Sequence, residues 1–82
     1  MQGKYDDAEP LYRRAIAITE ATHGEDHPVY SDLLNNLAML LVAKGKYKDA
    51  EPLFRRAMES AEATLGEEHP DYSFGLKNLA AL

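Results

Sequence analysis

Residues 3–15 have the sequence GKYDDAEPLYRRA, and residues 45–57 have the sequence GKYKDAEPLFRRA. When residues 1–40 are compared with residues 43–82, at an offset of 42, 25 of the 40 positions are identical. Similarity at a fixed spacing of this length is typical of proteins built from stacked structural repeats. The sequence therefore predicts an architecture in which each unit buries its apolar surface against its neighbours.

Apolar residues within one period are spaced as on one face of an α-helix. Tyr30, Leu34, Leu37 and Leu41 follow one another at steps of four, three and four residues. That spacing brings them to a single side of a helix. The pattern predicts an all-α chain of four helices with no strand. The expected helices span residues 6–23, 28–43, 48–65 and 70–82.

Glycine and proline mark the expected ends of these helices. Gly45 stands between two lysines, where the end of a helix favours a left-handed residue. Gly24 and Gly66 end the segments before them. Pro28 and Pro70 fall at the first position of a helix, where proline loses no hydrogen bond.

Pro10 and Pro52 fall within the other two expected helices. A proline in the interior of a helix removes a hydrogen bond and clashes with the preceding turn. We therefore expect these helices to begin near Asp7 and Asp49, so that each proline lies in the first turn.

The composition excludes several classes of protein. The 82 residues carry a net charge of −5 and contain no cysteine. A basic nucleic-acid-binding stripe, a disulfide framework and a thiolate metal site are therefore not expected. The longest apolar stretch, residues 37–43, is too short to cross a bilayer, and the first residues lack the apolar core of a signal peptide. We expect a cytoplasmic protein that binds neither nucleic acid nor membranes.

No combination of residues predicts catalysis or metal binding. His23 and His27 are four residues apart, but Gly24 and Pro28 interrupt the helix that would align them as ligands. The sequence contains no glycine-rich phosphate loop and no nucleophile with a suitably spaced histidine and acid. We expect no enzyme activity and no cofactor.

Charged residues recur on one side of two expected helices. Glu9 and Arg13 are spaced as an i, i+4 ion pair, and the same pair recurs one repeat later. Such a pair stabilises a helix by only about 0.2–0.5 kcal/mol. Together with Arg14 and Arg56, these residues are expected to form a solvated outer face.

The repeat resembles the tetratricopeptide family. The positions of that signature are occupied here by Leu34, Leu37, Ala38 and Leu41, followed by Ala50, Phe54 and Ala57. The chain departs from the signature by having Leu34, Ala38 and Leu41 where tryptophan, glycine and tyrosine are usual. The spacing of 42 residues, with Gly-Glu-Asp/Glu-His-Pro in the loop, resembles the longer repeat found in kinesin light chains.

This resemblance implies an α-solenoid of antiparallel helix hairpins wound into a right-handed superhelix. It divides the chain into the second helix of one repeat (residues 1–24), one complete repeat (25–66) and the first helix of the next (67–82). Each end helix would then lack its hairpin partner. A second molecule placed head to tail would nearly complete the broken hairpin, as an open stack rather than a closed ring.

Members of the family grip peptides or helices on an inner, concave face lined mainly by first helices. In this chain the resemblance assigns that face to Asp32, Asn35, Asn36, Met39, Val42, Phe74, Lys77, Asn78 and Ala81. Asn36 and Asn78 resemble asparagines that hydrogen-bond a bound peptide backbone, and a helix-to-helix bond inside the array is the alternative. Phe74, which replaces Asp32 of the preceding repeat, either anchors a partner or packs against a following helix.

Lys77 and Asn78 also resemble part of a clamp that captures acidic C-termini in chaperone-binding relatives. Ala81 and Met39 occupy the positions where a second basic residue would be needed, so the clamp is incomplete.

Two functions follow as expectations. The first is a protein-binding scaffold that receives a peptide or helix of a partner on its concave face. The alternative is a structural fragment that assembles with itself through its unpaired end helices.

Overall fold

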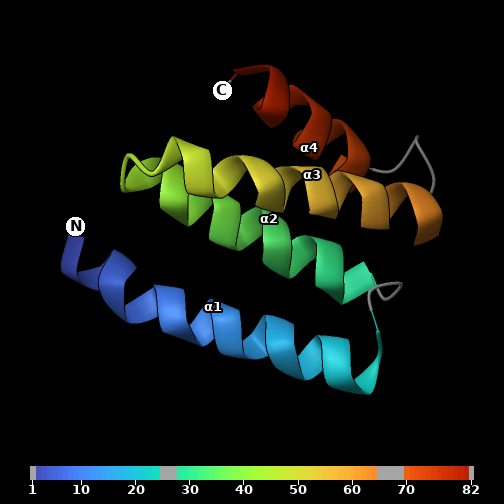
Figure 1. Cartoon of the computed structure of the whole chain (residues 1–82), viewed down its shortest axis with the longest axis horizontal. Helices are drawn as coiled ribbons and strands as arrows, with labels where there is room; N and C mark the ends of the chain where they lie inside the picture. The colour runs from blue at the N-terminus through green and yellow to red at the C-terminus, as the bar shows by residue number, and fades with distance from the viewer. Residues whose placement is uncertain (1, 25–27, 65–69, 82) are drawn as a thin grey trace.

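The computed structural model describes residues 2–24, 28–64 and 70–81, and these residues form four α-helices without a strand. The helices are α1 (Gln2–Thr22), α2 (Pro28–Ala43), α3 (Tyr47–Thr64) and α4 (Pro70–Ala81). Successive helices run antiparallel and stack side by side, with α2 and α3 in the middle (Figure 1). The predicted all-α solenoid of helix hairpins is confirmed.

The core lies around α2 and α3. Helix α2 packs against both α1 and α3, and α4 packs mainly against α3. The buried apolar side chains of the two central helices are Tyr30, Leu34, Leu37, Ala38, Leu41, Ala50, Phe54 and Ala57. The three alanines are fully buried, which allows the backbones of the hairpin to approach closely.

The turn between α2 and α3 has the predicted glycine at its centre. Gly45 has φ 79, in the left-handed region. Its backbone N–H bonds the carbonyl of Val42 at 2.9 Å, and the N–H of Lys46 bonds the carbonyl of Leu41 at 2.8 Å. This is a Schellman arrangement, which satisfies the last carbonyls of a helix. Gly24 has φ 76 at the end of α1.

The expectation that Pro10 and Pro52 lie in the first turn is wrong, although the start of α3 lies within two residues of its expected position. Helix α1 begins at Gln2 and α3 begins at Tyr47, so Pro10 lies in the interior of its helix and Pro52 lies in the second turn. Both prolines are exposed, so the carbonyls left without an N–H partner lie on the outer side of each helix, near water. The first half of α1 is also held by ion pairs between Lys44 and the α1 residues Asp6 and Glu9, as described below.

Helix α4 approaches α3 closely at Gly75. A Cβ atom added to Gly75 would lie 3.2 Å from the Cβ of Met58 and 3.3 Å from the carbonyl oxygen of Phe54. The counterpart of Gly75 one repeat earlier is Leu33, whose side chain occupies the space between α2 and α1. The two interfaces therefore differ: a glycine closes one, and a leucine fills the other.

Gly75→Leu is expected to lower the free energy of unfolding by about 1–3 kcal/mol, because the new side chain meets backbone and Cβ atoms that have little room to move. Gly75→Ala should cost less, since alanine gains about 1 kcal/mol of helix propensity over glycine. Urea unfolding followed by circular dichroism measures both. A Gly75→Leu chain as stable as wild type would contradict the close contact of α3 with α4.

Candidate functional site

A hollow opens between α2 and α4. It has a volume of about 250 Å³ and is lined by Asp32, Asn35, Asn36 and Phe74. All four belong to the set that the family resemblance assigned to the inner face. They come from two helices separated in sequence by the whole of α3, so the packing of the repeats brings them together.

Asn35 carries an unusual polar atom at this hollow. The residue is only 5% exposed, and its side-chain oxygen Oδ1 is buried without a hydrogen-bond partner. A buried acceptor left unpaired costs about 1–3 kcal/mol, and native proteins contain few of them. Oδ1 of Asn35 therefore has unused acceptor capacity in a residue that lines the hollow.

Phe74 supplies a fixed aromatic surface beside Asn35. Its ring centroid lies 6.1 Å from that of Phe54, with the rings tilted by 59°, an arrangement that aromatic pairs favour. Phe54 is fully buried, whereas Phe74 remains 38% exposed. One side of Phe74 is thus held by the core while the rest is available to a partner. Two contacts were expected for Phe74, with a partner or with a following helix. The structure shows a third contact, with Phe54 of the preceding helix α3.

The other predicted residues do not line the hollow. Met39, Lys77 and Ala81 are exposed, and Val42 is half-buried against the core. The Asn78 side-chain amide donates a hydrogen bond to the carbonyl of Phe74 at 2.7 Å, within its own helix. That bond is neither the expected peptide contact nor the expected helix-to-helix bond.

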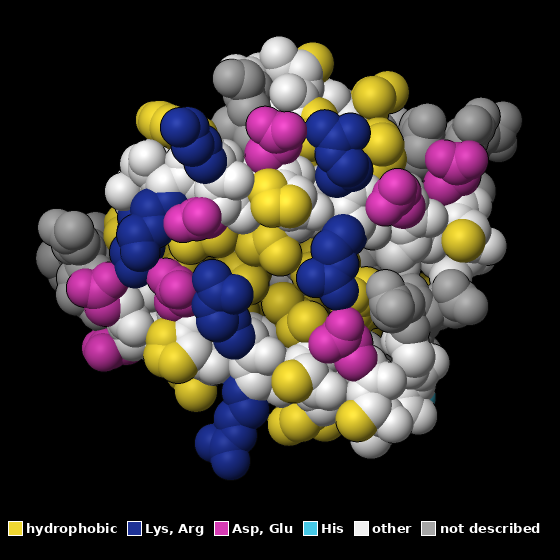
Figure 2. Space-filling model, in the orientation of Figure 1, with side chains coloured by type: hydrophobic (Ala, Val, Ile, Leu, Met, Phe, Trp, Pro, Cys, Tyr) yellow, Lys and Arg dark blue, Asp and Glu magenta, His cyan; other side chains and the backbone are white. Residues whose placement is uncertain are grey.

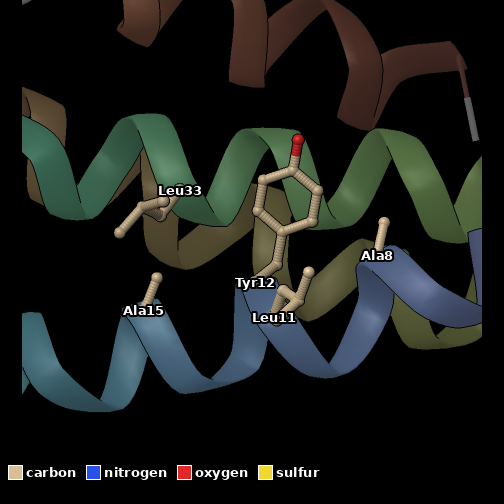
Figure 3. Close-up of a pocket in the computed structure, with 5 residues that line it drawn as sticks. All are labelled: Ala8, Leu11, Tyr12, Ala15 and Leu33. Carbon is tan, nitrogen blue, oxygen red and sulfur yellow. The ribbon is translucent and has the colours of Figure 1, made fainter.

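A second, apolar groove lies along α1. It has a volume of about 340 Å³, and its lining residues are Ala8, Leu11, Tyr12, Ala15 and Leu33. Figure 3 shows the four α1 side chains along one helix, with Leu33 reaching the groove from α2. The site prediction did not include this groove. The offset of 42 could have found it, because the counterparts of its alanines and of Tyr12 are the fully buried Ala50, Ala57 and Phe54 of α3.

Charged side chains surround hydrophobic ones on the face shown in Figure 2. Two ion pairs on this molecule are the predicted i, i+4 pairs: Arg13 with Glu9 at 3.2 Å and Arg55 with Glu51 at 3.3 Å. The Arg55 pair is exposed on both sides. Such pairs contribute little to stability.

Lys44 joins the turn after α2 to the first half of α1. Its Nζ lies 2.7 Å from an oxygen of Asp6 and 2.9 Å from Oε1 of Glu9, and its side chain is 8% exposed. The hydrogen bond from Lys44 lowers the pKa of Glu9, with a smaller contribution from Arg13. The hydrogen bonds to Asp6 and then to Glu9 raise the pKa of Lys44.

Lys44→Met is expected to make the chain less sensitive to acid. A carboxyl group whose pKa is lowered on folding adds stability above its usual pKa, here 4.5, and that stability is lost as the pH falls through the lowered value. Without Lys44, the pKa of Glu9 lies nearer its usual value of 4.5, so Glu9 contributes less stability that can be lost in acid. The measurement is the urea midpoint at neutral pH and at several values below 4.5, with Lys46→Met as a control of equal charge. Equal acid sensitivity in wild type and Lys44→Met would contradict this assignment.

Arg56 corrects the prediction of a purely solvated outer face. Its guanidinium donates a hydrogen bond to Oε2 of Glu20 at 3.1 Å and lies 5.6 Å from the centre of the Tyr30 ring. It also bonds the Tyr30 hydroxyl, which donates to the same Glu20 oxygen at 3.0 Å. We call Glu20, Tyr30 and Arg56 the bridging cluster. It links α1, α2 and α3 in one contact.

The described part of the chain was also searched for a metal site and for a membrane-spanning helix. No group of three or more His, Cys, Asp or Glu side chains within residues 2–24, 28–64 and 70–81 is placed to hold a metal ion. None of the helices in those ranges is both long and apolar enough to cross a membrane. His23 is exposed, and His27 lies outside the described residues.

Helix hairpins that repeat in sequence and stack side by side place this chain in the class of helical-repeat proteins. The family model for the tetratricopeptide repeat matches residues 1–63 and 30–82. The chain belongs to the tetratricopeptide repeat family. Repeats of this family generally mediate protein–protein interaction and form non-catalytic scaffolds. Comparison with curated proteins gave no match.

Proposed function

We propose that the chain is a protein-interaction scaffold that binds an extended peptide segment of a partner in the hollow between α2 and α4. The observation that carries this proposal is the buried, unpaired Oδ1 of Asn35 at a hollow that also presents an exposed aromatic ring. An extended peptide has backbone N–H groups that can donate a hydrogen bond to this oxygen. It also has side chains that can pack on Phe74.

The charge and polarity of the hollow indicate the kind of peptide. Asp32 adds a carboxylate and Asn36 an exposed amide beside Asn35. The hollow thus offers the Asn35 oxygen as an acceptor, the Asn36 amide as both donor and acceptor, and a carboxylate beside one ring. This lining favours a peptide that presents N–H groups and an apolar or basic side chain. The proposed concave face also includes Met39, Val42, Lys77, Asn78 and Ala81. All of these except Asn78, whose amide is bonded within α4, would extend the contact along α2 and α4.

The proposal includes the finer family assignment. The offset of 42 residues and the repeated loop sequence support the long repeat that resembles kinesin light chains. It also includes the division at residues 1–24, 25–66 and 67–82, and a place in the cytoplasm.

The test uses a peptide selected from a displayed library of random peptides on the 82-residue chain. Asn36→Ala is expected to weaken binding about threefold to tenfold, the effect of one lost hydrogen bond. Asn78→Ala is the matched control, because Asn78 is the sequence counterpart of Asn36 and its amide is bonded within α4. Failure to select any binder, or equal affinities for the two variants, would contradict the proposed binding site.

We infer self-association as a second function, from apolar side chains exposed at both ends of the stack. On α4, Leu76 is 50% exposed, whereas its counterpart Leu34 on α2 is fully buried. On α1, the groove around Tyr12 is open, whereas the same face of α3 is covered. One copy's α4 could therefore pack on another copy's α1 as α2 packs on α3.

Light scattering after size exclusion, over a hundredfold range of concentration, tests this function. A mass that rises with concentration, and that returns to the monomer in Leu76→Glu, is the expected result. Leu79 is a poorer choice for the substitution because it already packs against the core. A constant monomer mass would rule self-association out over that range.

A further inference from the structure

The bridging cluster has counterparts one repeat away in both directions. At an offset of 42, Glu62 corresponds to Glu20 and Tyr72 corresponds to Tyr30. In the other direction, Arg14 corresponds to Arg56. The sequences of α3 and α4 therefore include the glutamate and the tyrosine that correspond to a second bridging cluster, and the sequence of α1 includes its arginine.

Within the chain, the arginine of the cluster comes from the helix that packs on the tyrosine's helix. Arg56 of α3 reaches across α2 to Glu20 of α1. Beside Glu62 there is instead a hollow of about 400 Å³, lined by Glu59, Glu62 and Ala63. Glu62 and Arg14 are both exposed. Because Glu62 corresponds to Glu20, an arginine that entered this hollow would meet Glu62 as Arg56 meets Glu20.

We propose that a second copy of this chain docks its α1 on the α4 face of the first, and that Arg14 of the second copy bonds Glu62 of the first. This inference rests on the self-association proposed above and adds the contact that sets its register. The occupant is a second copy because α1 reproduces the sequence of α3, arginine included, and α3 is the helix that covers the equivalent face of α2.

The apolar part of this interface would leave its register poorly defined. The groove on α1 presents alanines and larger side chains at helical spacing, such as Ala8, Leu11, Tyr12 and Ala15, so a shift by one helical turn would still bring apolar surfaces together. The Arg14–Glu62 pair forms in only one register. Glu59 lines the same hollow as Glu62, so two acidic side chains favour a cation at that point.

Charge reversal tests the pair without removing apolar surface. Arg14→Glu alone and Glu62→Arg alone are each expected to raise the dissociation constant of self-association about tenfold or more, because like charges then face each other at every contact. An equal mixture of the two variants should associate to within about threefold of wild type. In the mixture, alternating copies place opposite charges at every contact.

Arg13→Glu is the matched control. It changes the net charge by the same amount one residue away, at a side chain that pairs with Glu9 on its own helix. Sedimentation velocity gives the mass, and circular dichroism checks that each variant is folded. Loss of association in both single variants, with recovery in the mixture, is the expected result.

Two other results would overturn the inference and can be told apart. If wild type associates and Arg14→Glu behaves like Arg13→Glu, or if the mixture fails to recover, the register contact is wrong while self-association stands. If wild type stays monomeric at every concentration, self-association fails and the inference fails with it.

Discussion

Phe54→Ala is expected to lower the free energy of unfolding by about 3–5 kcal/mol, the usual cost of deleting a fully buried aromatic side chain. Phe54 is fully buried in α3 and meets the ring of Phe74 on α4. Its removal would leave a cavity at the point where α2, α3 and α4 come together. Because small domains are stable by only about 5–15 kcal/mol, this loss is a large share of the total, and we expect the urea midpoint to fall strongly.

The repeat supplies a matched control for this substitution. Tyr12 is the counterpart of Phe54, but it is only half-buried and lines the open groove on α1. Tyr12→Ala is expected to cost on the order of 1–2 kcal/mol, because the area it removes from water is smaller. Urea unfolding at a concentration low enough to keep the chain monomeric measures both. Equal losses for the two variants would contradict the open groove.

Much of the fold follows from signals that act over short distances. The spacing of Tyr30 and Leu34 and the proline at position 28 predicted α2 at its observed bounds of 28–43. Gly45 was predicted, and found, where the chain must adopt a left-handed residue. The family resemblance assigned Asn35 and Phe74 to one surface, and the repeat shows that they lie on corresponding helices, α2 and α4.

Other features depend on contacts between distant residues, and the local sequence does not reveal them. Residues 3–5 and 45–47 are both Gly-Lys-Tyr. The first copy is helical, whereas Gly45 and Lys46 form a turn. The turn exists because α2 and α3 pack face to face and the chain must reverse between them.

The side chains of Lys44 and Arg56 illustrate the same limit. Each of them reaches a helix that is far away in sequence, at Glu9 and Glu20 respectively. Long, flexible cations on a helix surface have several possible partners within reach. Only the arrangement of the helices selects one, so the sequence pattern predicted a solvated face where the structure has bridges between helices.

Asn35→Leu is expected to stabilise the chain while it destroys the proposed binding site. The Oδ1 atom of Asn35 is buried and unpaired, and replacing it by an apolar group of similar size removes a cost of about 1–3 kcal/mol. For a domain of this size, each kcal/mol raises the melting temperature by about 4–8 °C. Differential scanning calorimetry would therefore detect the gain.

The same substitution should weaken peptide binding about tenfold or more, because a peptide N–H directed at Asn35 would be buried without an acceptor. Asn36→Leu is the control: Asn36 is adjacent and exposed, so its replacement should change stability little. A less stable Asn35→Leu chain would show that Oδ1 has a partner in solution. Greater stability with unchanged affinity would show that the buried oxygen does not face the ligand. Greater stability with weaker peptide binding is the result that the proposed peptide-binding function predicts, because a binding site retains a polar atom that folding alone does not require.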